Sequence, residues 1–223
     1  MSPQTKSKQR IRDHGEVFTA EREVKAMCDL VKDECDRIDS RFLEPACGDG
    51  NFLAEILTRK LATVRKKYGK SHSDYEKNAV LAASSIYGVD ILQDNVQACR
   101  DRMFGIWDKE YTAVCKQDCN DETRDAVKFI FSRNIVCGNA LTLKCVDENG
   151  KDTDEPIVFS EWAFVTGSQM QRSDYTFAEL LADSQRKPDE NQRSIFDDEE
   201  TFGDEGKFLK RYVSHYRRVQ YDG

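Results

Sequence analysis

The sequence predicts an α/β fold in which a parallel sheet carries helices on both faces, and three observations favour this fold. Short apolar segments typical of buried parallel strands lie at 41–43, 85–91 and 134–141. Longer segments between them place apolar residues three and four positions apart, as amphipathic helices do. A tight turn, Gly48-Asp49-Gly50, joins the first strand segment to a helical segment. After residue 141 the alternation ends, so we expect a sheet that is truncated or degenerate beyond its third strand.

The length of 223 residues predicts one domain with flanking segments. Residues 1–13 are polar and basic and are expected to form a flexible arm. The ligand-binding domain is expected at 14–183. Residues 184–223 are expected to form a polar, partly disordered tail that contains the acidic run 197–200, with a terminal helix at 207–218 as a candidate element.

Composition narrows the class of protein. No apolar run approaches the roughly 18 residues of a membrane helix, and no secretion signal is visible, so we expect a cytoplasmic protein without a membrane partner. The eight cysteines are therefore expected to be reduced thiols. Cys115 and Cys119 have no second pair at metal-binding spacing, so no metal is expected. The net charge of −7 argues mildly against DNA binding by this chain alone.

The helices are predicted from their caps and apolar faces. Thr19 is the expected N-cap of a helix that runs to about residue 38. The apolar face of this helix consists of Val24, Met27, Val31, Cys35 and Ile38. Further helices are expected at 51–68 with Gly69 as C-cap, at 74–84, around 96–106 and at 121–132.

The glycine turn has features that distinguish between nucleotide-sized ligands. A dinucleotide site would carry a third glycine where this chain has Leu53, and an acid, Glu44, precedes Gly48 by four residues. The string E-P-A-C-G-D-G-N-F-L closely resembles motif I of the class I S-adenosylmethionine-dependent methyltransferases, in particular the N6-adenine DNA methyltransferases of restriction–modification systems. This resemblance implies a Rossmann-like methyltransferase sheet. The cofactor contacts that it implies here are Glu44, Pro45, Ala46, Cys47, Gly48, Gly50, Asn51 and Phe52.

Three further strings resemble motifs of the same family. G-E-V-F-T-A at 15–20 resembles motif X, which implies cofactor contacts by Phe18 and Thr19, although Ala20 replaces the usual proline. Asp90 ends the second strand segment, where a carboxylate can accept hydrogen bonds from both ribose hydroxyls. G-V-D-I resembles motif II, in which Ile91 would pack on the adenine. Motif III is matched around Asn139, Ala140 and Leu141, with Asn139 in place of the usual acid.

The catalytic motif of this family is missing. A proline-proline-aromatic tetrapeptide should hold the target base, but no two prolines are adjacent in this chain. Ser160, Glu161 and Trp162 are the weak candidates for a divergent catalytic loop. The alternative is a half-buried strand with Trp162 in the core. We expect 156–165 to form a hairpin with 141–146, Ile157 to Phe159 to lie beside Phe42 and Leu43 in the sheet, and a short helix at 170–183.

The resemblance therefore implies an S-adenosylmethionine-binding, DNA methyltransferase-like protein of adenine-N6 type within a restriction–modification or defence system. DNA is the expected macromolecular partner, bound either by this chain alone or only together with a partner subunit. An alternative is a catalytically inactive cofactor-binding or regulatory subunit that needs a partner chain. A nicotinamide-dependent oxidoreductase is less favoured, because the third glycine is missing.

Overall fold

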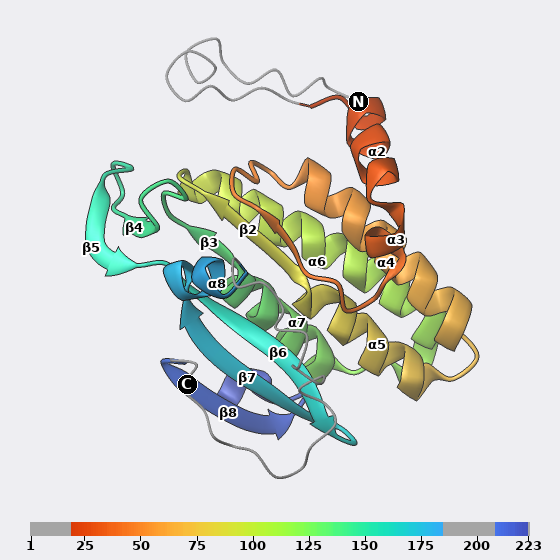
Figure 1. Cartoon of the computed structure of the whole chain (residues 1–223). Coiled ribbons are helices and arrows are strands. Elements are labelled where there is room, and N and C mark those ends of the chain that lie inside the picture. The colour runs from red at the N-terminus through yellow and green to blue at the C-terminus, as the bar shows by residue number, and fades with distance from the viewer. Residues whose placement is uncertain (1–18, 185–207, 223) are drawn as a thin grey trace, which may run out of the picture.

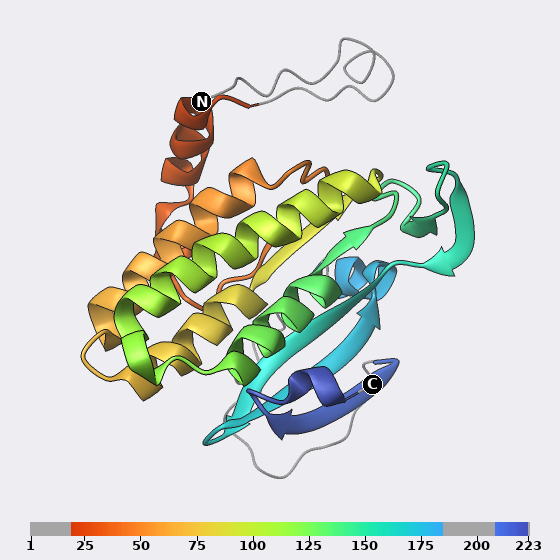
Figure 2. The ribbon, with the colours of Figure 1, turned by 180° about the vertical axis from the view of Figure 1, so that it is seen from behind.

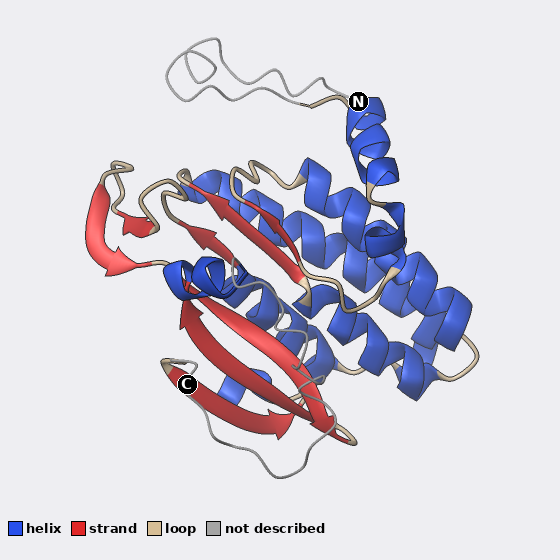
Figure 3. Cartoon of the chain, in the orientation of Figure 1, coloured by secondary structure: helices blue, strands red, loops and turns tan. Residues whose placement is uncertain are grey.

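The computed structural model describes residues 19–184 and 208–222. The described part is a mixed α/β structure in which helices pack against three small sheets (Figures 1 and 3). The expected arm at 1–13, most of the motif X string at 15–18 and the acidic run at 197–200 lie outside the described residues.

A three-stranded parallel sheet stands at the centre of the fold. Its strands are β1 (Phe42–Glu44), β2 (Ile86–Asp90) and β3 (Ile135–Cys137), in the order β1-β2-β3. Leu43 lies opposite Tyr87, and Val89 lies opposite Val136. The middle strand is thus β2, and β1 is at an edge of the sheet.

Four helices gather behind this sheet in the view of Figure 1 and in front of it in Figure 2. They are α4 (Asn51–Tyr68), α5 (His72–Ser84), α6 (Gln93–Cys115) and α7 (Asp121–Asn134), with a 3-10 turn η1 at Lys116–Asp118. The predicted bounds of α4 and its cap at Gly69 are confirmed. Leu53, Tyr75 and Trp107 are fully buried in the main core, where Trp107 stacks on Tyr111 at a centroid distance of 4.6 Å.

The N-terminal helical region differs from the prediction of one continuous helix. It consists of α2 (Glu21–Leu30) and α3 (Lys32–Asp36), separated by Val31 in a non-helical conformation. Its N-cap is Ala20 rather than Thr19, because the Ala20 carbonyl accepts the first bonds from Glu23 and Val24. The buried face of α2 carries Cys28 instead of Met27, which is 50% exposed.

The chain after β3 forms two further sheets. The first is a ribbon of β4 (Lys144–Val146) and β5 (Asp152–Pro156). The second is an antiparallel sheet of β6 (Val158–Thr166), β7 (Gln169–Thr176) and β8 (Lys210–His215). Helix α8 (Phe177–Ser184) follows β7, and the 3-10 turn η2 (Val219–Tyr221) follows β8.

Four expectations for this region are wrong. Strand β6 (Val158–Thr166) pairs with 169–176 rather than with 141–146, although Pro156, at the end of β5, lies opposite Lys144. Residues 170–176 are a strand, and the terminal helix at 207–218 is mainly strand β8. Nor does Ile157-Val158-Phe159 pair with Phe42 and Leu43, since β6 belongs to a different sheet.

Gly167, with a φ of 57°, supplies the tight turn from β6 into β7. The buried residues of β7 include Arg172 and Asp174, whose charges hide the strand pattern.

The second face of the parallel sheet packs against α8 and β6. Tyr87 and Val89 from β2 form a smaller core there with Phe159 and Phe177. Tyr216 and Val219, which follow β8, join the main core. Within the described ranges, no helix has the length and apolar character needed to cross a membrane.

Candidate functional site

The candidate site lies at the carboxyl ends of the three parallel strands. Glu44 is the last residue of β1, Asp90 is the last residue of β2, and Asn139 follows β3 by two residues. Backbone bonds join the segments that follow β1 and β3 to the end of β2: Cys47 N donates to Val89 O at 2.8 Å, and Gly138 N donates to Asp90 O at 2.9 Å. The sheet thus brings together three of the side chains that the sequence singled out.

The glycine turn, residues 48–50, leads from β1 into α4. Gly48 and Gly50 have φ angles of 53° and 87°, which favour glycine strongly. Gly50 must also be small, because a Cβ atom there would lie 2.6 Å from the Cys99 Sγ on α6. Gly50 is the N-cap of α4, so the free N–H groups of this helix begin at the turn.

Asp90 holds the glycine turn as well as facing the candidate site. Its carboxylate accepts hydrogen bonds from Gly48 N at 2.9 Å, Leu92 N at 2.9 Å and Asn95 Nδ2 at 3.1 Å. A carboxylate offers about four acceptor positions, so about one remains for a ligand. A ribose diol that used both oxygens would therefore have to lengthen one of the present bonds.

The charges around the turn differ in how far they are neutralised. Asp49 forms an ion pair with Arg102 of α6 at 3.0 Å. Burial raises the pKa of Glu44, and a weak bond from Ala46 N opposes this effect. A hydrogen bond with Cys99, together with burial, raises the pKa of Cys47, so this thiol stays neutral. The turn is thus flanked by the carboxylates of Glu44 and Asp90, and no cation pairs with either among the described residues.

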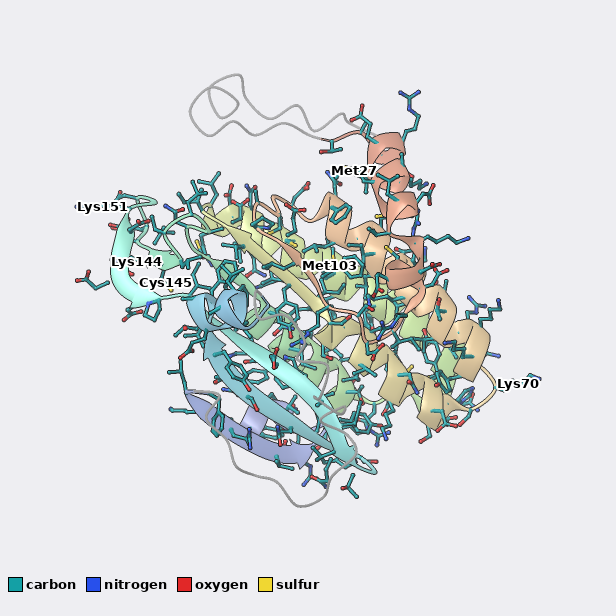
Figure 4. All side chains as sticks on the ribbon, viewed as in Figure 1. Met27, Lys70, Met103, Lys144, Cys145 and Lys151 are labelled. Atoms are coloured by element: carbon teal, nitrogen blue, oxygen red, sulfur yellow. The ribbon has the colours of Figure 1, made fainter. Side chains whose placement is uncertain are left out.

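Asn139 connects the site to the β4–β5 ribbon. Its Oδ1 accepts from Leu141 N at 3.0 Å, and its Nδ2 donates to Asp152 Oδ1 at 3.0 Å. The ribbon also reaches the end of β2, since a Cβ atom on Gly150 would lie 3.8 Å from Ile91. The labelled side chains Lys144, Cys145 and Lys151 mark this ribbon at the rim of the molecule in Figure 4. Asn139 keeps one acceptor position on Oδ1 for a ligand.

The remaining predicted contact residues lie in different environments. Pro45 and Ala46 are exposed beside the turn, whereas Asn51 and Phe52 are half-buried in the first turn of α4. Ala140 is partly buried against the smaller core, and Leu141 is 95% exposed. Thr19 is exposed ahead of α2, and no hydrogen bond in the described chain joins it to the glycine turn. Phe18 lies outside the described residues.

The fold does not bring Ser160, Glu161 and Trp162 to this edge. Strand β6 begins near the carboxyl end of β3, where Ile157 meets Gly138, and runs toward the amino end, where Trp162 Nε1 donates to Asn134 Oδ1 at 3.0 Å. Trp162 lies in the main core, as the half-buried strand alternative expects. Glu161 forms an ion pair with Arg41, which precedes β1.

Ser160 belongs to a buried polar network. Its hydroxyl donates to Asp174 Oδ1 at 2.6 Å, and Arg172 binds both oxygens of Asp174 at 2.9 and 2.8 Å. Arg133 adds bonds to Ser160 Oγ and to Asp174 Oδ2, both at 3.3 Å. Burial acts to raise the pKa of Asp174, but the bonds from Arg172 and Ser160 outweigh it and lower the pKa. This network joins β6 and β7 to α7 and supplies no group to the candidate site.

Sequence reasoning missed the residues that hold the turn from outside it. Arg102 and Asn95 on α6 bind Asp49 and Asp90, and the ribbon reaches Ile91. Their sequence signal is weak, since an arginine or asparagine on a helix between apolar positions is an ordinary surface residue. In the described chain, no group of three or more His, Cys, Asp and Glu side chains is placed to hold a metal ion.

Comparisons of this chain with known protein families, with curated proteins and with solved structures found no match.

Proposed function

We propose that this chain binds S-adenosylmethionine at the carboxyl edge of the parallel sheet and is a Rossmann-like, class I methyltransferase-type protein. The observation that carries the proposal is the placement of Glu44 and Asp90 at the ends of adjacent parallel strands, on either side of the glycine turn. In parallel α/β sheets, ligands bind at the carboxyl ends of the strands. The string around the turn, E-P-A-C-G-D-G-N-F-L, is the part of the sequence that favours this cofactor.

The charges favour S-adenosylmethionine over a dinucleotide. S-adenosylmethionine carries a sulfonium and an ammonium group and no phosphate, so the carboxylates of Glu44 and Asp90 attract it. A pyrophosphate at the same turn would be repelled by these carboxylates. In addition, Leu53 is fully buried where a dinucleotide fold would have its third glycine, and close helix–strand contact is made instead at Gly88.

The proposed substrate class is adenine in DNA, methylated at N6, in a restriction–modification or defence system. Bound S-adenosylmethionine would supply an electrophilic methyl group. The residues of this chain would bind and orient the cofactor: Asp90 at the ribose, Ile91 beside the adenine ring and Glu44 near the ammonium group. This part of the proposal depends on the motif resemblance.

A second candidate function is a cofactor-binding subunit that does not transfer methyl groups by itself. The position of Ser160, Glu161 and Trp162 favours it, because β6 places them toward the amino end of the sheet. The chain also has no proline pair to hold a flipped base. Under this function a partner chain would supply the base-holding groups.

Calorimetry tests cofactor binding directly. S-adenosylmethionine, S-adenosylhomocysteine and NAD are titrated separately into the whole chain, and we expect binding of the first two only. Asp125→Ala is a control variant that should bind S-adenosylmethionine as the wild type does. It removes an exposed acid of α7 that pairs with Lys128, away from the turn. Binding of NAD alone, or of none of the three, would contradict the proposal.

A methyl-transfer assay separates the two candidate functions. The chain is incubated with labelled S-adenosylmethionine and unmodified DNA, alone and with candidate partner subunits. We expect poor transfer by the chain alone. Robust transfer without a partner would exclude the non-catalytic subunit and would show that an unrecognised group holds the base.

A further inference from the structure

Side chains on one face of α6 contact the glycine turn. Arg102 Nη2 lies 3.0 Å from Asp49 Oδ2, and Nη1 lies 3.5 Å from Asp49 Oδ1. The same Nη1 donates to Asn51 Oδ1 at 2.5 Å. One guanidinium group thus holds the residues on both sides of Gly50, which itself has a φ of 87°.

The neighbours of Arg102 on α6 complete this contact. A Cβ atom on Gly50 would meet Cys99 Sγ at 2.6 Å and Met103 Cε at 3.1 Å. Met103 is fully buried, and its label lies over the middle of the molecule in Figure 4. On its other side the turn is held by Asp90, which accepts from Gly48 N. The turn is therefore held by polar contacts from Arg102 and Asp90 and by the side chains of Cys99 and Met103, which lie against Gly50.

The ion pair between Arg102 and Asp49 also changes the charge beside the turn. The Asp49 side chain is 14% exposed and that of Arg102 is 33% exposed, so water screens this pair less than an ordinary surface pair. The planar guanidinium group matches the two carboxylate oxygens, which a lysine cannot do. Because the charge of Arg102 balances that of Asp49, the remaining negative charge beside the turn comes from Glu44 and Asp90.

We propose that Arg102 is a positioning residue for the cofactor: it holds the glycine turn in its binding conformation and cancels the charge of Asp49. Arg102 need not touch the ligand. The inference rests on the proposed binding of S-adenosylmethionine at this turn, but the immobilisation of the turn can be measured without any ligand.

Arg124 provides a matched control. Like Arg102, it is an arginine held by ion pairing, in its case with two carboxylates, Asp108 at 2.6 Å and Asp121 at 2.9 Å. Its side chain is 23% exposed, and it links the start of α7 to the C-terminal half of α6. Loss of Arg124 therefore tests the general effect of removing such an ion pair, without a contact to the turn.

The experiment compares wild type with Arg102→Gln, Arg102→Lys and Arg124→Gln. Amide hydrogen exchange of the peptide that covers 45–52 is measured without ligand, and the Kd for S-adenosylmethionine is measured by calorimetry. We expect Arg102→Gln to speed exchange in this peptide at least tenfold and to raise the Kd at least tenfold. Arg102→Lys should lie between wild type and Arg102→Gln, while Arg124→Gln should leave both quantities near the wild-type values.

The readouts separate the failure of this inference from the failure of the proposed function. If wild type binds no S-adenosylmethionine, the proposed function fails, and hydrogen exchange still decides whether Arg102 holds the turn. Unchanged exchange in Arg102→Gln overturns the inference, whatever the wild type binds. Equal losses of affinity in Arg102→Gln and Arg124→Gln also overturn it, because the effect would then be one of general stability.

Discussion

Asp90 Oδ2 accepts a hydrogen bond from the backbone N–H of Gly48 at 2.9 Å, so the end of β2 holds the turn that follows β1. The two residues are separated by 42 positions in the chain and meet because β1 and β2 are adjacent and parallel. Since Asp90 supports the turn and also faces the proposed ribose position, its substitution should act on both.

Replacing Asp90 should therefore weaken cofactor binding. We expect Asp90→Ala to reduce the binding free energy of S-adenosylmethionine by roughly 1.5–3 kcal/mol, the range for hydrogen bonds to a charged group. Asp90→Asn should lose less, because its Oδ1 can still accept from Gly48 N or Leu92 N. Calorimetric Kd values check this, and an unchanged Kd for Asp90→Ala would remove Asp90 from the site.

Gly50 should not tolerate a side chain. Gly50→Ala would place a Cβ 2.6 Å from Cys99 Sγ at a φ of 87°, so we expect a loss of about 2–4 kcal/mol from overpacking and backbone strain. Gly105→Ala is the control: Gly105 lies inside α6 with open space around it, and the change should stabilise the protein by up to about 1 kcal/mol. Urea unfolding of both variants measures the two effects, and equal stabilities would refute this view of the turn.

Ser160 should matter for stability and not for the cofactor site. Ser160→Ala removes the donor to Asp174, and we expect a loss of about 1–2 kcal/mol in the free energy of unfolding. The Kd for S-adenosylmethionine should stay unchanged, because Ser160 lies in the network that joins β6, β7 and α7. A large rise in Kd without loss of stability would instead return Ser160 to the candidate site.

Stability should fall in acid as Asp174 becomes protonated. The pKa of Asp174 in the folded protein lies below its ordinary value of 3.8, so the folded state binds fewer protons than the unfolded state. The stabilisation is complete above pH 3.8 and is lost as the pH falls through the lowered pKa. Urea unfolding between neutral pH and pH 3 measures this loss.

Asp174→Asn should make this acid-dependent decrease shallower. If that variant does not fold, Ser160→Ala serves instead, since it removes one bond that lowers the pKa of Asp174. In Ser160→Ala the folded-state pKa of Asp174 should lie closer to 3.8, so the decrease in stability should be smaller and should end at a higher pH. An acid profile identical to wild type in every variant that folds would show that another carboxyl group controls the decrease.

Local signals in the sequence predicted the first half of the fold well. Helix α4 begins after the glycine turn and ends before Gly69 as expected, because apolar periodicity and cap residues act within a few positions. The prediction was wrong for the helix expected at about 19–38, where the chain leaves the helical conformation at Val31. Cys28 is then buried in place of Met27, a change of one position that periodicity alone does not resolve.

The sequence by itself determined the glycine turn and the acids Glu44 and Asp90, because short apolar strands followed by turns place such residues at one edge of a parallel sheet. Only the tertiary structure decided how strands β4 to β8 pair, where β6 places Ser160, and that Arg102 binds Asp49. These contacts join residues far apart in the chain. Their geometry depends on how whole elements pack, and no periodic pattern within either partner encodes it.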